Sequence, residues 1–536
     1  MPLIFFYIFY KNALTSAGFF AIINYGYLYA EYYIIIIYAR EIMKKLIAIL
    51  LLASMLVSTV ACAENKDDPS QDTSANETNA DATEAETTDE PKLPDFNGEG
   101  ADFTMLYRHG TSSYNEDFVF IEAPTGEVVD DAIFERNLAV AEKFDVNIVG
   151  IEDNMEVSNK VQLTAQANEN TYDLVFQRRT ELATDMVSGY LSDFNNVPEI
   201  NWEAPYWDSN ASTGLSLGGK QYLAVSDISL ENLTNVRFLY FNRALIERYH
   251  VPDPYDYVFS DTWTLDVVLD MIKMVSDDLD GDGKMTGADR YGLLREDGGS
   301  NSNFVQIIQG CDIPYTAPGE NGMPEIILNT EKVVKVIEKC TDVLLDNNIT
   351  IEYGSASKGA DITGYNHIYD YCRGALFTTD HFLFLQCGLD GCNTMKDMES
   401  DFGFMPAAKY DENQEHYISG VDANEPAMFI PATIEDVESI GAIIEYMAWK
   451  SHYTVFPAYY EITIKGKRVR DERDEVACDI VKDNLHYEVS DIMSFGISSM
   501  IWDGFKGNNF ASKYEKKCKQ INKTIEKTAD KFEAIG

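Results

Sequence analysis

The stretch DAIFERNLAVAEKFDVNIVGI, residues 131–151, decides the fold class because a helix pattern is followed at once by a strand pattern. Apolar side chains recur at helical spacing as far as Phe144. Beyond Asp145, residues 146–151 form a short run typical of a buried strand. The pattern continues on both sides, with strands predicted at 101–107 and 172–176 and a helix at 158–167. Strands that alternate with helices predict an α/β domain with a largely parallel sheet.

The same alternation returns in the second half of the chain. Strands are predicted at 238–241, 375–379 and 402–405, and helices at 242–249, 263–276, 331–345, 435–450 and 511–535. A body of this length is too long for one hydrophobic core, so we expect two domains that interleave along the chain.

Residues 43–62 have the pattern of a secretory signal. Met43, Lys44 and Lys45 precede an apolar run that is too short for a comfortable membrane span and that ends at Cys62. The ending TVAC resembles a bacterial lipobox, which predicts that Cys62 carries a lipid and holds the protein at the extracellular face of the membrane. The alternative is an ordinary signal peptide with Cys62 incidental. Residues 1–42 are interpreted as a misassigned start or an extra apolar segment.

Residues 63–98 are predicted to be a disordered acidic tether. Between residues 63 and 92 there are ten carboxylates and, apart from two prolines, no apolar side chain larger than alanine. Such a segment buries too little apolar surface to offset the entropy lost on ordering.

The composition excludes some classes of partner and site. The formal net charge is −46, from 88 acidic and 42 basic residues, so a nucleic-acid partner is not expected. Seven cysteines besides Cys62 are scattered without CxxC pairs, which argues against a zinc site.

The loop DLDGDGKMTGAD, residues 278–289, has the spacing of a calcium loop. Hard Ca²⁺ takes six to eight oxygen ligands, and a glycine at the sixth position permits the sharp turn that such loops need. The predicted ligands of this structural Ca²⁺ are Asp278, Asp280, Asp282, Lys284 through its carbonyl, Thr286 and Asp289. The alternative is an acidic surface turn without a metal.

Several segments, in their order, resemble the extracellular solute-binding proteins of ABC transporters, in particular the sugar-type family of Gram-positive lipoproteins. The segments are YLSD at 190–193, PYWD at 205–208, LYFNRAL at 239–245, DTWTLD at 261–266, DRYGL at 289–293 and PAAKYDENQEHY at 406–417. The likeness spans roughly residues 100–500.

The resemblance implies a two-lobed α/β fold of the type II periplasmic-binding-protein kind, with interleaved domains, hinge crossings and the ligand in the cleft. Lobe one is predicted to contain 99–234 and 375–430, and lobe two 235–374 and 431–536. The resemblance also implies that the ligand is a small solute, most simply a sugar. It further implies that ABC permease subunits are the partners.

Residues at the carboxyl ends of parallel strands point into such a cleft. A sugar needs aromatic platforms together with charged or amide groups that form directed hydrogen bonds. The candidate ligand contacts are therefore Arg108, His109, Arg178, Trp207, Asp208, Asp380, His381, Tyr459 and Tyr460. The alternative for each is a surface ion pair, a satisfied loop residue or a side chain that packs inward.

The favoured function is capture of a carbohydrate for import, without covalent chemistry. A secreted glycoside hydrolase is one alternative, because pairs of carboxylates are easily found in so acidic a chain. A sensory or adhesion lipoprotein that keeps the fold but serves no transporter is another.

Overall fold

The structure is a computed structural model, and the chain divides into two compact units, Met1–Glu86 and Thr87–Gly536. The described residues all belong to the second unit and are 90–108, 119–153, 156–234, 236–296, 303–328, 331–365, 367–389, 391–465 and 471–535. The predicted segments 1–42 and 43–62, most of the tether, Cys62 and His109 lie outside them.

Lobe one is built on a sheet with the order β13-β3-β1-β2. Its strands are β1 (Ala101–Arg108), β2 (Val146–Asp153), β3 (Leu174–Arg178) and β13 (Pro426–Phe429). Strand β1 pairs in parallel with β2 and β3, whereas β13 runs antiparallel to β3. Helices α3 (Val128–Phe144) and α4 (Val157–Ala167) connect the parallel strands, as the sequence predicts.

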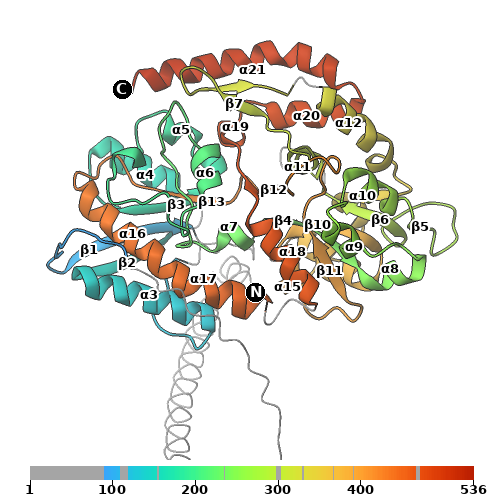
Figure 1. Cartoon of the computed structure of the whole chain (residues 1–536), viewed down its shortest axis with the longest axis horizontal. Coiled ribbons are helices and arrows are strands. Elements are labelled where there is room, and N and C mark those ends of the chain that lie inside the picture. The colour runs from blue at the N-terminus through green and yellow to red at the C-terminus, as the bar shows by residue number, and fades with distance from the viewer. Residues whose placement is uncertain are drawn as a thin grey trace, which may run out of the picture. The chain divides into compact units, whose positions relative to one another are not determined.

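Lobe two is built on a second sheet with the order β11-β4-β10-β6-β5, to which β9 adds beside β6. Its strands are β4 (Arg237–Asn242), β5 (Ser276–Asp277), β6 (Arg290–Arg295), β9 (Thr350–Glu352), β10 (Phe382–Gly388) and β11 (Phe402–Met405). Figure 1 shows the two sheets in separate halves of the described body. The predicted two-lobed α/β fold with interleaved domains is confirmed.

The remaining elements are mostly helical. The helices after lobe one's first strands are α5 (Ala183–Met186), α6 (Ser209–Gly214), α7 (Glu231–Thr234), α8 (Arg243–Tyr249), α9 (Pro254–Phe259), α10 (Leu265–Ile272), α11 (Asn303–Gly310), α12 (Glu331–Leu344), α13 (Tyr353–Ala356), α14 (Ile368–Tyr371) and α15 (Gly391–Thr394). The later helices are α16 (Val437–Tyr453), α17 (Val455–Pro457), α18 (Glu472–Lys482), α19 (Val489–Ile492), α20 (Ile497–Gly507) and α21 (Phe510–Glu533).

Short turns and hairpins complete the body. The 3₁₀ turns are η1 (Arg179–Glu181), η2 (Phe194–Asn196) and η4 (Phe377–Thr379), and the π-helical segments are η3 (Cys372–Leu376) and η5 (Ala458–Lys465). Strands β7 (Thr316–Pro318) and β8 (Pro324–Ile326) form a hairpin, and β12 (Ser419–Gly420) pairs with β14 (Leu485–His486). None of the helices in the described ranges is long and apolar enough to cross a membrane.

The predicted partition of the lobes is wrong for the segment 375–430. Residues 375–379, predicted as a strand, are helical, and the strand is β10, all seven residues of which are buried. Strands β10 and β11 both pair with β4, so they belong to lobe two, and only β13 returns to lobe one. Helical spacing and apolar runs cannot reveal which sheet a strand joins.

The predicted assignment of residues 431–536 to lobe two also needs correction. Helix α16 packs against α3, and its residues Ile443 and Met447 share a core with Phe103 and Val140 of lobe one. The chain reaches lobe two only afterwards, where α18 packs beside β11.

The folded body begins earlier than residue 99. The Phe96 ring stacks on Phe144 at a centroid distance of 5.4 Å, and the Gly98 amide donates to the Phe144 carbonyl at 2.7 Å. Leu93 packs against the same core. The predicted tether therefore cannot extend to residue 98, because its last apolar side chains are anchored on lobe one.

Candidate ligand-binding site

The two sheets present the carboxyl ends of their parallel strands to the crossing segments. Pro426 lies opposite Arg178 at the end of β3, and Arg237 lies opposite Gly388 at the end of β10. Between the lobes, Val236 and Val421 form an antiparallel bridge. Because the chain crosses at the edge where the parallel strands of each sheet end, these two edges face one another. We call them the facing edges.

Lobe one contributes two arginines to its facing edge. Arg108 ends β1, is 8% exposed, and lies 3.8 Å from the carboxylate of Glu181. Arg178 ends β3, and its amide donates to the side chain of Gln177 at 2.8 Å. The structure thus places both predicted residues where the strand-end rule puts them.

Lobe two contributes a buried ion-pair network at the hinge. Arg237 lies 3.1 Å from Glu296 and also pairs with Asp422 of the second crossing segment. Burial alone lowers the pKa of Arg237, but the two carboxylates outweigh it and the net pKa is raised. The network therefore ties the first crossing segment to the second through charges that little water reaches.

An aromatic segment, made up of Tyr365 and residues 367–371, was missed by sequence reasoning, and it adjoins this network through Tyr353, on which Glu296 acts electrostatically. It follows β9, whose last residue Glu352 lies opposite Arg295 at the facing edge. Tyr353 packs against Tyr369 at 4.9 Å, and Tyr369 in turn packs against His367 at 4.4 Å, both measured between ring centroids. The signal that could have found it is GYNHIYDY, with three tyrosines and a histidine in eight residues.

Tyr365 is the open member of the aromatic segment. Its ring meets Tyr371 edge-on at 5.4 Å, yet 36% of the residue remains exposed. An aromatic face that a neighbour fixes and water still reaches can stack on the apolar face of a sugar ring.

Trp207 is not a stacking platform. The residue is 4% exposed, and its indole N–H donates to Glu445 at 2.9 Å. Tyr206 also donates to Glu445, as does the Asn201 amide at 3.2 Å. Burial raises the pKa of Glu445, which these donors partly offset. Trp207 is therefore part of the lobe-one core, held by a helix more than two hundred residues away in sequence.

Asp208 has a structural role as well. Its carboxylate caps α6 by accepting the Ala211 amide at 3.0 Å, and it accepts the Tyr487 hydroxyl at 2.7 Å. The Arg179 guanidinium stacks over the Tyr487 ring at 4.9 Å. Asp208 thus helps to hold lobe one against the segment after β14.

Asp380 and His381 lie at the wrong edge for ligand contact. They precede β10 instead of following a strand, because the predicted strand 375–379 is helical. Asp380 accepts hydrogen bonds from Asn242 and Ser400, each at 2.6 Å, and His381 contacts Thr379 at 2.9 Å. These contacts hold Asp380 and His381 in the loop that precedes β10.

Tyr459 and Tyr460 pack inward. They are 5% and 2% exposed, within η5. The Tyr460 hydroxyl donates to Asp479 at 3.1 Å, which joins η5 to α18. These tyrosines brace a crossing segment and do not line an open surface.

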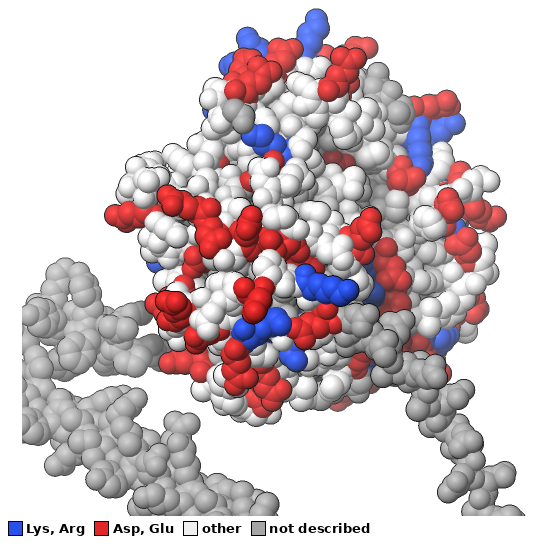
Figure 2. Space-filling view, turned by 60° about the vertical axis from the view of Figure 1, so that its left-hand side comes forward, with Lys and Arg blue, Asp and Glu red and all other residues white. Residues whose placement is uncertain are grey.

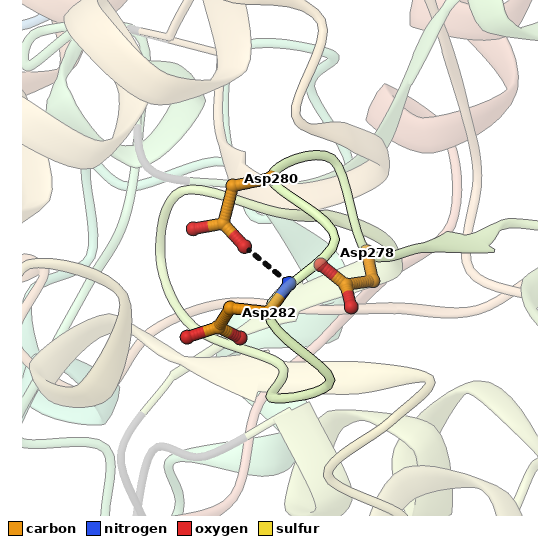
Figure 3. A group of neighbouring side chains, drawn as sticks. All are labelled: Asp278, Asp280 and Asp282. Atoms are coloured by element: carbon orange, nitrogen blue, oxygen red, sulfur yellow. Dashed lines mark hydrogen bonds between the residues drawn. The ribbon is translucent and has the colours of Figure 1, made fainter.

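The predicted calcium loop brings together only part of its predicted ligands. One oxygen from each of Asp278, Asp280 and Asp282 lies within 4.8 Å of the other two, on an exposed turn (Figure 3). Asp278 accepts the amides of Gly281 and Gly283, both at 2.7 Å, and the Gly283 contact is the largest cause of its lowered pKa.

The last predicted calcium ligand is turned inward. Asp289 is fully buried and accepts hydrogen bonds from the amides of Leu279 (2.9 Å) and Thr286 (2.7 Å) and from the Thr286 hydroxyl (3.1 Å). Thr286 and Asp289 therefore close the loop on each other, and Asp289 is not in the acidic group.

Comparisons with known proteins rest on structure alone. No protein-family model matches the chain, and no curated protein matches it. An ABC substrate-binding protein from Listeria monocytogenes, in complex with cycloalternan, aligns with a TM-score of 0.50 and 13% identity over 80% of this chain and 99% of its own. The chain has the fold of ABC solute-binding proteins.

Two further solved structures agree with this fold. A cyclo/maltodextrin-binding protein complexed with maltotetraose aligns with a TM-score of 0.51 and 13% identity, over 80% of this chain and 98% of its own. M. tuberculosis UspC aligns with a TM-score of 0.50 and 11% identity, over 80% and 100%. The predicted type II periplasmic-binding-protein-like fold is confirmed.

Proposed function

We propose that the protein captures a carbohydrate at its facing edges and delivers it to ABC permease subunits for import. The observation that carries this proposal is the aromatic segment with its exposed Tyr365 beside the charged hinge, on a fold whose solved neighbours include binders of cycloalternan and maltotetraose. Aromatic faces contact the apolar side of a sugar ring, and Arg108 and Arg178 supply hydrogen-bond donors for its hydroxyls.

Binding is expected to work by closure of the lobes. A ligand shifts the equilibrium only to the extent that it makes better contacts in the closed form. A sugar held between Tyr365 of lobe two and Arg108 of lobe one satisfies this condition, because neither edge alone surrounds it. The acidic surface in Figure 2 also fits a neutral ligand better than a polyanion.

The test is isothermal calorimetry of the unit Thr87–Gly536 against maltotetraose, cycloalternan, shorter sugars and amino acids. We expect heat with at least one sugar and an affinity in the micromolar range, about −8 kcal/mol. Heat with amino acids or peptides alone would remove carbohydrate from the proposal. Growth of a deletion strain on the bound sugar separates a transport protein from a sensory one.

A substitution in the aromatic segment tests the site itself. We expect the double variant Tyr365→Ala/Tyr371→Ala to bind sugar about tenfold more weakly, since stacking pairs contribute about 0.5–1.5 kcal/mol each. Tyr453→Ala is the matched control because Tyr453 is 37% exposed on α16 of lobe one. Equal affinity of the double variant and the control would place the ligand elsewhere.

We propose that no covalent bond of the ligand is made or broken. The alternative, glycoside hydrolysis, needs two carboxyl groups about 5 to 9.5 Å apart on either side of the bond. Overnight incubation with chromogenic glycosides and with maltotetraose is expected to release no product. Turnover that survives re-purification would favour the hydrolase.

The lipid anchor at Cys62 and the place of the protein outside the cell are part of the same proposal. Residues 43–62 support both the anchor and the location, because basic residues are followed there by an apolar run that ends at Cys62. Metabolic labelling with a fatty-acid analogue is expected to mark the native protein, and Cys62→Ala is expected to release it into the medium. Labelling of both proteins, or of neither, would contradict the anchor.

We also propose that Asp278, Asp280 and Asp282 hold a structural Ca²⁺, with carbonyls and water completing the shell. Three carboxylates close together repel one another, and a bound cation removes that repulsion. At a hundred times the dissociation constant, Ca²⁺ adds about 2.7 kcal/mol of stability.

The expected result is a rise of about 5 °C in the melting temperature on adding Ca²⁺ after chelation, given the usual few degrees per kcal/mol. Asp280→Asn/Asp282→Asn should abolish the rise, whereas Asp270→Asn, on exposed α10 surface, should not. If the melting temperature were the same with Ca²⁺ and with chelator, the loop would be an acidic surface turn that binds no metal.

A further inference from the structure

The last helix, α21, concentrates positive charge in an acidic protein. Between Phe510 and Glu533 it carries seven lysines and four acidic residues, whereas the whole chain has 42 basic and 88 acidic residues. Figure 2 shows basic side chains projecting at the top of the body, where α21 runs in Figure 1. An outer element of the body is therefore basic although the chain as a whole is strongly negative.

The apolar side of α21 is already covered by the body. Its buried residues are Phe510, Ile521, Ile525 and Phe532. The Phe532 ring meets Tyr222 edge-on at a centroid distance of 5.8 Å, and the helix also packs on α20, α12 and β8. A further partner of α21 must therefore be met by the polar side of the helix.

Exposed lysines form a row on that polar side. They are Lys516, Lys519, Lys523, Lys527 and Lys531, which we call the lysine stripe. They recur every three or four residues and so share one face of the helix, over a length of about 22 Å at 1.5 Å per residue. Lys523 and Lys527 each follow a buried isoleucine by two residues, about half a helical turn. The lysine stripe therefore faces away from the body.

The protein does not neutralise the lysine stripe. Lys517, beside the stripe, pairs with Asp503 of α20 at 2.7 Å. In contrast, none of the stripe lysines lies within ion-pair distance of an acidic group in the ranges that the structure describes. Glu526 and Asp530 are exposed along one edge of the stripe, so they offset only part of its charge. The outer side of α21 keeps an excess of positive charge.

We propose that the lysine stripe docks the folded body on an anionic phospholipid surface. The inference takes from the proposed function only the anchor at Cys62, and it does not depend on the sugar. Residues 63–89 lie between that cysteine and the described body and can span up to about 90 Å, so the anchor alone leaves the orientation of the body open. The charge on each outer face then decides which face meets the membrane.

The net charge of −46 does not prevent this contact. Charges farther from a surface than the Debye length, about 8 Å at physiological ionic strength, are largely screened, and α21 lies on the outside of the body. Each basic residue at an anionic surface strengthens binding by about fivefold. A weak contact is enough, because the anchor holds the body at a high local concentration.

The test asks whether the lysine stripe is covered when the body is held at a membrane. A chain of residues 62–536 with Cys518→Ser is coupled through the Cys62 thiol to a maleimide lipid, since the other cysteines are buried. The vesicles contain phosphatidylcholine alone, or equal parts of phosphatidylcholine and phosphatidylglycerol. The coupling supplies the anchor, so the outcome does not depend on native lipidation.

Acylation of each lysine by an amine-reactive ester is then followed by mass spectrometry. We expect the stripe lysines to react about fivefold more slowly on the anionic vesicles than on phosphatidylcholine. About 1 M salt, which shortens the Debye length to about 3 Å, should remove the difference. Exposed lysines elsewhere on the body should react equally on both kinds of vesicle, and the controls are Lys273, Lys358 and Lys396.

Two variants of equal net charge separate the stripe from charge in general. Lys519→Gln/Lys523→Gln/Lys527→Gln is expected to lose the protection of Lys516 and Lys531. The matched variant, Lys273→Gln/Lys358→Gln/Lys396→Gln, is expected to keep it.

Equal acylation of the stripe on both kinds of vesicle would overturn the inference, as would equal loss of protection in the two triple variants. Protection on phosphatidylcholine alone that rises with the density of attached protein would overturn it too, because a second copy of the chain would then occupy the stripe. Sugar binding is measured separately by calorimetry, so a failure of the proposed function is distinguished from a failure of this docking surface.

Discussion

Replacing Glu445 with alanine is expected to lower the free energy of unfolding by about 3–5 kcal/mol, as for the loss of one partner from a buried charged network. The side chain is 1% exposed and accepts hydrogen bonds from Trp207, Tyr206 and the Asn201 amide. Alanine would leave these donors buried without an acceptor, and a buried donor without a partner is costly.

Urea unfolding of the unit Thr87–Gly536 measures this effect, with Glu438→Ala as the control on the exposed face of the same helix. Glu445→Gln keeps an acceptor oxygen and should lose less than alanine does. Trp207→Ala should likewise destabilise the protein. A Trp207→Ala variant of native stability that no longer binds sugar would show that Trp207 contacts the ligand after all.

Replacing Arg237 with methionine is expected to cost a similar amount, about 3–5 kcal/mol, because it removes the cation between two buried carboxylates. Arg237 forms ion pairs with Glu296 and Asp422. The side chains of all three residues are about a tenth exposed. The same change loosens the connection between the crossing segments at Val236 and Val421.

The matched control for Arg237 is Arg248→Met, an exposed arginine at the end of α8. The double variant Arg237→Met/Asp422→Asn removes one of the two carboxylates, so it should recover part of the lost stability. With the single variant Asp422→Asn added, the unfolding curves of the native chain, the two single variants at Arg237 and Asp422 and their double variant form a double-mutant cycle. Equal stability of Arg237→Met and Arg248→Met would show that the network contributes nothing at the hinge.

The fold class was readable from the chain because helical spacing is regular in residues 131–144 and the flanking strands are short apolar runs. What could not be read was which sheet each later strand joins. Strand β10 is buried along its whole length, so it lacks the alternation that would mark its position, and its neighbours are far away in sequence.

The site was readable only in part. The strand-end rule placed Arg108 and Arg178 correctly because their strands were predicted correctly, and it misplaced Asp380 and His381 because theirs was not. Trp207 looked available because its acceptor, Glu445, lies on a distant helix that no local pattern connects to it. The tyrosines of residues 365–371 were visible in the sequence, but their position depends on the pairing of β9 with β6.

The central claim is that two lobes close reversibly on a sugar and leave it unaltered. Small-angle X-ray scattering of the unit Thr87–Gly536, before and after the sugar that gives heat in calorimetry, tests this most directly. The radius of gyration should fall on addition of the sugar and return to its starting value when the intact sugar is dialysed away. Saturating sugar that leaves the radius unchanged, or a recovered sugar that has been cleaved, would contradict the claim.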